Sequence, residues 1–351
     1  MSNVTNHEKP GVYSVYEASA IINGAGGAKT VAAVALCDRG TAGTVYPILK
    51  LAEAETTFGK DSAMTELIRL LLQNGAAKVM AVPVAAESGY KAAFDAVAAV
   101  EEVSIVLCDS TTLTVQQGLR ASVDAASQAR RERIGVVYAG SGETVSNLVT
   151  RAAALNDERM VLVAPGGVTA NGTPETSARV AAAVAGAIAR ESDPAVPLGG
   201  AELRGLSGVA GQYTDEEMDT LIRGGVTVVE TVGGVTAVVR GITTRTTTLS
   251  APDSTWRELS TVLIVDEVIP GIRNTLRRRF PRAKNTEQSR GAIRSQVVLE
   301  LEDRVAREII TSYGDVSVTA KTNNPTVCLV EFSFTVAHGL SQIWLSAHIT
   351  V

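Results

Sequence analysis

Short apolar runs alternate with segments of helical periodicity along the first half of the chain. A run that is apolar on both faces and is followed by a helix is typical of a buried strand in a parallel sheet. The predicted strands are Val31–Leu36, Lys78–Val84, Val103–Cys108, Ile134–Tyr138 and Met160–Ala164. The helices predicted between them are Ala63–Gln73, Tyr90–Val100, Val115–Arg131 and Thr144–Leu155. Because parallel crossovers are right-handed, this alternation predicts a doubly wound α/β layer.

The segment after the fifth strand is predicted to contain two helices and a β-hairpin. Pro174 opens an Ala-rich stretch that predicts a helix over 174–191, because proline is well tolerated in a first helical turn. Thr214 precedes three acidic residues, which predicts a helix N-cap there and a helix that ends at Gly224-Gly225. Val226–Glu230 and Val235–Arg240 then form a predicted β-hairpin around Gly233-Gly234.

Composition shifts after Pro252 and predicts a second, α+β region. Leu259–Val265 is predicted as a strand, and Asp266 as the cap of a helix with Pro270 in its first turn. A second helix is predicted from Thr286 to Tyr313, stopped by Gly314. Two predicted strands, Val316–Lys321 and Val327–Val336, follow it.

The stretch Leu340–Val351 alternates apolar and other residues and contains no charged side chain. Period-two alternation predicts a strand with one buried face. An uncharged edge strand is prone to aggregation unless another strand pairs with it. Two partners are compatible with the pattern: Val327–Val336 of the same chain, or a second copy of the chain.

Composition narrows the classes of function. The chain has 351 residues, 45% hydrophobic, with a net charge of −5. The acidic balance argues against a general nucleic-acid partner. The apolar runs are too short for stable membrane insertion, and the first residues lack the pattern of a secretory signal, so we expect synthesis in a cytoplasm. The cysteines Cys37, Cys108 and Cys328 sit in apolar runs and are predicted to be buried and reduced.

Candidate chemistry is sparse. No histidine lies between Thr30 and Arg240, so a Ser/His/Asp site has no base there. A Walker-type phosphate loop and metal-ligand spacing are absent from the sequence, and the glycines of 23–28 precede a strand instead of following one. Asp38, Asp109 and Gly166-Gly167 fall at carboxyl ends of predicted strands, where α/β enzymes bind ligands, but polar loops occur there in any such fold. We therefore assign no catalytic, cofactor-binding or metal-binding residue.

The densest charge feature is a series of basic residues within 273–294. It is compatible with a solvated helix face near a helix C-terminus, or with a docking face for an acidic partner. Its first members are Arg273, Arg277, Arg278 and Arg279.

Several segments, in order, resemble the tail sheath proteins of contractile phage tails and contractile injection systems. Residues 10–13 (PGVY) look like the opening motif of the sheath N-terminal arm. Residues 31–84 and 164–166 are similar to parts of the sheath core, and 221–245 (LIRGGVTVVETVGGVTAVVRGITTR) to its helix–Gly–hairpin segment. Residues 256–313 resemble the C-terminal sheath domain.

The resemblance implies a domain organisation and a role. It implies an arm over 1–28, a subtilisin-like α/β core over 29–250, an α+β C-terminal domain over 251–337 and a C-terminal arm strand over 338–351. The chain is then a non-enzymatic sheath subunit without cofactors. Such subunits polymerise as stacked hexameric rings around an inner tube and contract to drive the tube through a target envelope.

The resemblance also implies partners and surfaces. The partners are other copies, the inner tail tube protein, and baseplate and tail terminator proteins, in a virion tail or injection particle assembled in the cytoplasm of the producing bacterium. The residues implied to link subunits through the arms are Val12, Tyr13, Val15, Tyr16, Ile343, Leu345, Ala347, Ile349 and Val351. The C-terminal domain would face the tube through Arg273, Arg277, Arg278 and Arg279.

Two other readings remain open at this stage. One is an α/β enzyme, hydrolase-like or nucleotide-binding, with an oligomerisation tail. The other is a different self-assembling subunit, such as that of a shell or tube.

Overall fold

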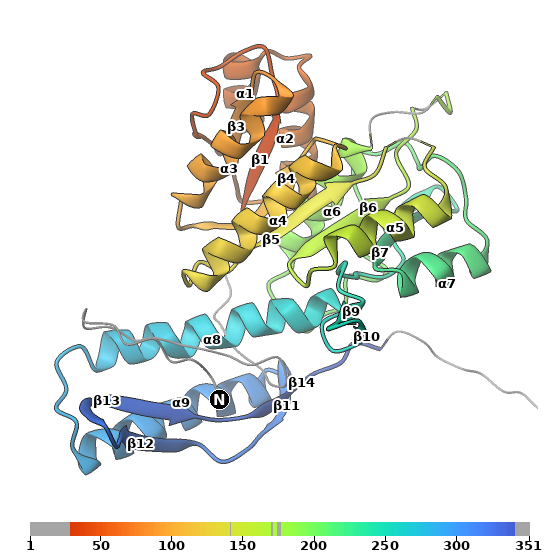
Figure 1. Ribbon diagram of the computed structural model, residues 1–351. Coiled ribbons are helices and arrows are strands. Elements are labelled where there is room, and N and C mark those ends of the chain that lie inside the picture. The colour runs from red at the N-terminus through yellow and green to blue at the C-terminus, as the bar shows by residue number, and fades with distance from the viewer. Residues whose placement is uncertain (1–28, 141, 170, 174–176, 341–351) are drawn as a thin grey trace, which may run out of the picture.

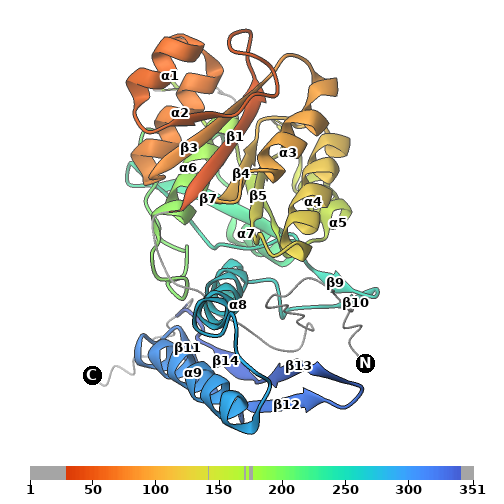
Figure 2. The ribbon, with the colours of Figure 1, turned by 90° about the vertical axis from the view of Figure 1, so that its left-hand side faces the viewer.

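The structure is a computed structural model that describes residues 29–140, 142–169, 171–173 and 177–340. These residues form two parts, a helix-covered sheet above and two long helices with short strands below (Figure 1). Helix α8 (Leu259–Arg279) runs along the boundary between the two parts, and Figure 2 shows it nearly end-on in that position.

An eight-stranded sheet organises the upper part, in the order β2-β3-β1-β4-β5-β6-β7-β8. The strands from β3 to β7 in this order are parallel, and β2 and β8 add an antiparallel strand at each edge. Their bounds are β1 Thr30–Leu36, β2 Tyr46–Ile48, β3 Lys78–Val84, β4 Val103–Cys108, β5 Ile134–Tyr138, β6 Met160–Ala164, β7 Val226–Val232 and β8 Val235–Val238.

Helices cover both faces of this sheet. Alternate strand residues face opposite ways, so Val31 and Ala33 join the apolar cluster under α2 and α6, whereas Ala32 and Val34 join the cluster under α3, α4, α5 and α7. This confirms the predicted α/β layer. The bounds are α1 Leu51–Phe58, α2 Ala63–Asn74, the short 3-10 helix Glu87–Gly89, α3 Tyr90–Ala98, α4 Leu113–Gln128, α5 Val145–Leu155, α6 Ala178–Arg190 and α7 Asp215–Arg223.

The predicted ends of the core strands agree closely with the structure, but α6 begins at Ala178, four residues after the predicted helix start at Pro174. Four of the five predicted core strands match to the residue, and β1 begins one residue earlier, at Thr30. The Thr214 hydroxyl accepts the Glu217 N–H, so Thr214 caps α7 as predicted. Gly75 ends α2 with φ 115°. Gly233 and Gly234, both at positive φ, form the predicted turn between β7 and β8.

Helices α2 and α6 approach closely at a buried asparagine and a glycine. A Cβ on Gly186 would lie 2.6 Å from the Asn74 Cβ. The Asn74 side chain donates to the carbonyl oxygens of Leu70 and Arg204, both at 2.9 Å, and accepts the Arg204 N–H at 2.8 Å. Asn74 therefore fastens the loop around Arg204 to α2 with its hydrogen-bonding groups satisfied.

The lower part contains two helices and two small antiparallel sheets. Helix α9 (Glu287–Ala306) lies beside α8, and β11 (Ile310–Tyr313) pairs with β14 (Phe334–Val336). Strand β12 (Ser317–Lys321) pairs with β13 (Asn324–Glu331). A short hairpin of β9 (Thr247–Thr248) and β10 (Ala251–Pro252) connects the two parts along the chain.

Residues 259–265 form a helix, so the prediction of a strand there is wrong. They are the first turns of α8, which places Asp266 inside the helix instead of at its cap and Pro270 in mid-helix. A short apolar run is compatible with either a buried strand or a buried helix. Here the buried positions Val262, Val265 and Val268 recur at helical spacing. Packing of these side chains against both parts of the molecule favours the helix, although Pro270 has no backbone N–H to donate to it.

The second predicted helix of this region is too long. Helix α9 ends at Ala306, and Ile310–Tyr313 leave it to pair with β14, so Gly314 does not stop the helix. The predicted strand Val327–Val336 is divided between β13 and β14. In both cases non-local strand pairing prevails over the local pattern.

Candidate functional site at the domain junction

Helix α8 joins the apolar cores of the two parts. The cluster under α2 and α6 continues through Trp256 into buried residues of α8 such as Val262 and Val268, and then into α9 at Val297 and Leu301. Because one buried cluster spans both parts, separating them would expose apolar surface to water.

A buried ion pair crosses this junction. Arg159, immediately before β6, donates from its Nη1 and Nη2 atoms to the two carboxylate oxygens of Asp266 in α8, at 2.8 and 2.9 Å. The side chains are 4% and 15% exposed. Burial nevertheless raises the pKa of Asp266, and Arg159 opposes that rise. Two parallel hydrogen bonds between Arg159 and Asp266 fix both the distance and the angle between α8 and the sheet.

A second ion pair, between Arg273 and Glu132, fastens the other half of α8. The Arg273 Nη2 atom donates to Glu132 Oε1 at 2.6 Å, and both side chains are buried. Sequence reasoning placed Arg273 on one basic face with Arg277, Arg278 and Arg279, but the structure buries Arg273 and pairs it with Glu132 inside the chain.

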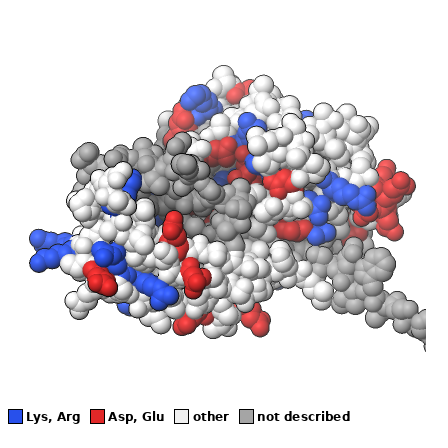
Figure 3. Space-filling model, turned by 60° about the horizontal axis from the view of Figure 1, so that its bottom comes forward, with Lys and Arg blue, Asp and Glu red and all other residues white. Residues whose placement is uncertain are grey.

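The remaining candidate arginines, Arg277, Arg278 and Arg279, are exposed at the C-terminal end of α8. Basic side chains are favourable there because the helix carboxyl end carries partial negative charge. Arg279 donates to Gln296 Oε1 of α9 at 2.5 Å. Figure 3 shows basic side chains projecting at the end of the molecule where α8 and α9 meet.

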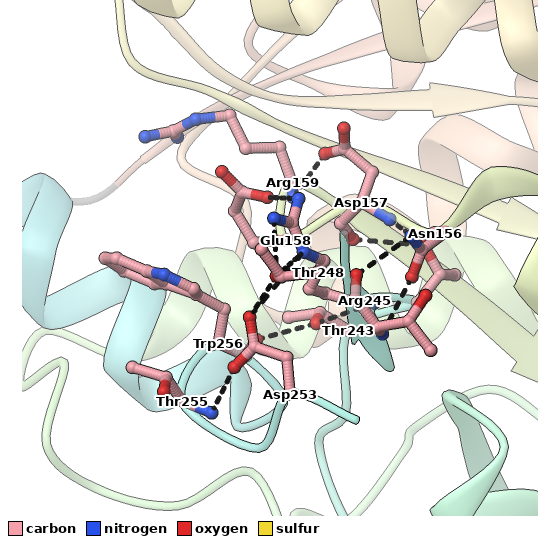
Figure 4. Close-up of polar contacts among 12 residues, drawn as sticks. Asn156, Asp157, Glu158, Arg159, Thr243, Arg245, Thr248, Asp253, Thr255 and Trp256 are labelled. Atoms are coloured by element: carbon pink, nitrogen blue, oxygen red, sulfur yellow. Dashed lines mark hydrogen bonds and ion pairs between the residues drawn. The ribbon is translucent and has the colours of Figure 1, made fainter. Parts of the chain in front are cut away.

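A polar network holds the chain between the two parts (Figure 4). The Asn156 side chain, at the end of α5, accepts the N–H groups of Thr246 and Thr247 at 3.1 Å and donates to the Thr247 carbonyl at 3.0 Å. Arg245 donates to Glu158 Oε2 at 2.9 Å and to the Thr248 hydroxyl at 2.8 Å. The connecting segment is therefore bound to the core before it reaches α8.

Sequence reasoning missed Arg159, Asp266 and Glu132. The available signal was a pair of acidic residues, Asp266 and Glu267, inside the apolar run that begins at Leu259. An acid in such a position needs a buried cation, because an unpaired buried charge is costly. Which arginine supplies it depends on the tertiary structure.

Glu267, next to Asp266 on α8, is a buried acid with a strongly shifted pKa. Burial raises its pKa to about 7, and Arg304, Arg307 and Lys29 oppose the rise. Its Oε1 atom has no hydrogen-bond partner among the described residues and lies 3.8 Å from the Arg307 Nη1 atom.

We expect Glu267→Gln to change how stability depends on pH. A folded-state pKa above the unfolded one stabilises the fold at low pH, and that stabilisation is lost as pH rises through about 7. Glutamine mimics the protonated acid, so the variant should match the parent chain at pH 5 and exceed its free energy of unfolding at pH 8 by on the order of 2 kcal/mol. Urea unfolding at both pH values measures this; equal differences at the two pH values would contradict it.

At the carboxyl edge of the sheet, Asp109 is hydrogen-bonded within the chain. Asp109, after β4, accepts the Leu36 N–H at 2.9 Å and the Tyr90 hydroxyl, and Tyr138 donates its hydroxyl to the Asp109 carbonyl. Burial raises the pKa of Asp109. Asp38 is exposed, and a Cβ on Gly166 would lie 2.3 Å from Ser177 Oγ. These contacts occupy Asp109 in joining β1 to β4.

All three cysteines are free thiols, as predicted, but only Cys108 is fully buried. Cys108 is buried, and burial raises the pKa of its thiol. Cys37 and Cys328 are free thiols but only partly buried. Among the residues that the structure describes, no group of three or more His, Cys, Asp or Glu is placed to hold a metal ion. Within the same residues, no helix is long and apolar enough to cross a bilayer.

The predicted arm residues lie outside the described residues. They are Val12, Tyr13, Val15, Tyr16, Ile343, Leu345, Ala347, Ile349 and Val351. The two pairing schemes for Leu340–Val351 likewise stay predictions.

Comparison with protein families identifies the chain. Residues 84–244 match the central domain of phage tail sheath proteins, and residues 251–350 match the phage tail sheath C-terminal domain. The chain belongs to the phage tail sheath family. The predicted resemblance is thus confirmed, and so is the prediction of a structural, non-enzymatic protein. The two matched regions meet at residues 245–250, within the network of Figure 4.

Individual relatives agree with this assignment. The tail sheath protein of Bacillus phage SP01 is 28% identical over 263 residues, which are 70% of this chain and 43% of that protein. The chain thus spans less than half the length of that relative.

Solved structures show the same fold at low identity. The sheath tail protein of Desulfitobacterium hafniense has a TM-score of 0.73 at 14% identity, covering 97% of this chain and 100% of that one. The helical sheath of the anti-feeding prophage in its contracted state has a TM-score of 0.73 at 17% identity, covering 98% and 99%. The sheath tail protein of Listeria innocua has the same TM-score at 14% identity, covering 91% and 93%.

Proposed function

We propose that this chain is the structural subunit of a contractile sheath that polymerises as stacked hexameric rings around an inner tube and contracts to drive the tube through a target envelope. The observation that carries the proposal is its fold match, over 98% of its length, to a helical sheath in the contracted state, together with both sheath family models. The subtilisin-like description of the core belongs to the same proposal.

Negative-stain microscopy of the purified chain, with and without its tube protein, tests the proposal. Tubes or rings of sheath-like diameter are the expected result. Small discrete particles under all conditions would contradict it.

The proposal includes terminal arms that link neighbouring subunits. The N-terminal arm would use Val12–Tyr16 and the C-terminal strand would use Ile343–Val351. A terminal strand that pairs with another subunit satisfies an open sheet edge and gives directional affinity. Because each subunit donates one strand and accepts another, the contact is heterologous and builds an open array.

Deleting residues 341–351 should abolish polymerisation and leave a folded, soluble chain. The reason is that the deletion removes the donated strand while the junction and core contacts remain. Sedimentation velocity measures assembly, and circular dichroism measures folding. A deletion chain that forms sheaths of normal length would refute the arm model.

The proposal also includes a tube-facing surface formed by Arg277, Arg278 and Arg279. Arg273 is left out of it because Glu132 already binds that side chain. A row of exposed guanidinium groups suits an acidic partner surface.

The triple variant Arg277→Glu/Arg278→Glu/Arg279→Glu should weaken co-sedimentation with the tube by about tenfold in low salt and leave sheath self-assembly intact. The difference should shrink as salt rises, because exposed charges are screened. Lys91→Glu/Arg223→Glu, at two exposed positions of the sheet part, is the control and should behave as the parent chain. Equal loss in both variants would assign the effect to net charge alone.

The remaining partners follow from the same proposal. The chain would act in a virion tail or injection particle, assembled in the cytoplasm of the producing bacterium, and would contact baseplate and tail terminator proteins. The fold likeness to a chain of the anti-feeding prophage baseplate structure supports the placement among tail components.

A further inference from the structure

An open cavity of about 460 Å³ lies between α7, the loop that follows β8 and the first residues of α8. One part of its wall is apolar and the other part is charged. The apolar side chains are Pro197, Leu198, Met218, Ile222 and Val239, and the charged ones are Asp215, Asp219, Arg240 and Glu258. An apolar group alone would separate those charges from water without replacing its hydrogen bonds. The cavity therefore fits a group that combines an apolar body with a polar atom.

The charged side chains of the wall leave acceptors for a hydrogen bond. Arg240 and Glu258 form an ion pair, with side chains 30% and 26% exposed. Asp219 pairs with Arg223 of the same helix, and Asp215 is exposed in the first turn of α7. Because a carboxylate accepts more than one hydrogen bond, these acids can still accept an N–H group of a ligand.

The last described residues of the chain lead to this cavity. Just after β14, the Ala337 N–H donates to the Ile309 carbonyl at 3.2 Å. A Cβ on Gly339 would lie 2.7 Å from the Pro197 Cβ, so the backbone passes directly against the cavity wall. Leu340 is itself one of the lining residues. The segment 341–351 therefore starts at the cavity.

Trp344 is the side chain of this segment that matches the mixed wall. Its indole ring is apolar and carries one N–H donor. The Met218 sulfur and the Arg240 guanidinium are groups that make favourable contacts with aromatic rings, and the Asp215 carboxylate is an acceptor for the indole N–H. Four residues of extended chain span up to about 14 Å, so Trp344 reaches the cavity from Leu340.

We propose that Trp344 binds in this cavity of its own chain and anchors the start of the C-terminal strand. The same chain is favoured over a second copy, because the short connection gives the indole a high local concentration at the cavity. The inference rests on the proposed function, in which Ile343–Val351 link neighbouring subunits. Side chains alternate along a strand, so Trp344 faces its own core while Ile343 and Leu345 face the neighbour. An anchored strand loses less conformational entropy when it pairs with the next subunit.

Tryptophan fluorescence tests the anchor in the unassembled chain. The chain has two tryptophans, so Trp256→Phe leaves Trp344 as the only one. Its emission should be blue-shifted from that of the urea-unfolded chain and protected from acrylamide. Emission and quenching equal to those of the unfolded chain would overturn the proposal. If Trp256→Phe fails to fold, fluorine NMR of the parent chain labelled with 5-fluorotryptophan gives the same readout, with Trp344→Phe as the assignment variant.

A nitroxide label beside the cavity tests its location. The label is attached to Asp219→Cys in a Cys37→Ser/Cys328→Ser background, and it should quench Trp344. The same label at Lys91→Cys on α3 is the matched control, since both positions are exposed, and it should not quench. Equal quenching from both positions would place Trp344 elsewhere. Quenching that grows with protein concentration would assign the cavity to the segment of a second copy and would overturn binding within one chain.

Trp344→Ser connects the anchor to assembly. The variant should raise the critical concentration for assembly by about tenfold, because the strand is no longer ordered before it pairs. His348→Ser, on the same side of the strand, is the control and should assemble as the parent chain does. If the parent chain forms no sheath, the proposed function fails whatever the fluorescence shows. If the parent chain and Trp344→Ser assemble equally well, only the anchor fails.

Discussion

Asp266→Ala is expected to lower the free energy of unfolding by about 3 kcal/mol, the size typical of breaking a buried ion pair. The change leaves the Arg159 guanidinium 4% exposed and without its carboxylate. The Arg133 carbonyl, 3.3 Å from Arg159 Nη1, is neutral and does not replace the lost carboxylate charge. Urea unfolding measures the loss, and hydrogen exchange should show α8 opening before the sheet.

The paired replacement Arg159→Met/Asp266→Leu separates charge from packing. Both charges are removed together, so no ion is left buried, and apolar side chains of similar size fill the space. We expect most of the lost stability to return. If the double variant is as unstable as Asp266→Ala, the geometry of the ion pair matters more than the unpaired charge. If Asp266→Ala alone lowers the free energy of unfolding by less than about 1 kcal/mol, the ion pair behaves as an exposed one, which would contradict its burial.

Gly186→Ala is expected to destabilise the chain by about 3 kcal/mol, although alanine is the better helix former. The new Cβ would lie 2.6 Å from Asn74 Cβ and 2.8 Å from the Leu71 carbonyl oxygen. Neither atom is the free end of a flexible side chain, so α2 and α6 must move apart, which costs about 1–3 kcal/mol and strains the Asn74 hydrogen bonds as well. Thermal unfolding measures the loss.

Gly118→Ala, within α4, is the matched control and should act in the opposite direction. A Cβ there meets only Phe94 Cε2, at 3.9 Å. Replacing a mid-helix glycine in open surroundings should stabilise the chain by about 0.5–1 kcal/mol. If both variants change the free energy of unfolding in the same direction, helix propensity dominates over the contact between α2 and α6.

The core strands were predictable because each satisfies a strong local rule. Strands such as Val103–Cys108 and Met160–Ala164 are short, apolar on both faces and bounded by polar or glycine-rich turns, so a helix of normal length does not fit. The end of α2 at Gly75 and the helix cap at Thr214 were predictable for the same reason, since each depends on one residue and on the backbone N–H and carbonyl groups next to it.

The junction was not predictable by the same rules. The run from Leu259 satisfies both a strand and a helix pattern, and only its position between two apolar surfaces makes it the start of α8. The same context turned Asp266 from an expected cap into a buried partner of Arg159, which lies 107 residues away. The sequence also does not show that Arg273 is paired, because its partner Glu132 lies 141 residues away.

The sequence by itself determined the parallel-rich α/β core, the absence of a histidine base within it and the resemblance to sheath proteins, because periodicity, composition and ordered motifs are local properties of the chain. The tertiary structure alone decided how α8 binds the two parts together and which arginines are exposed. Those features depend on contacts between residues distant in sequence, whose energies no local pattern contains.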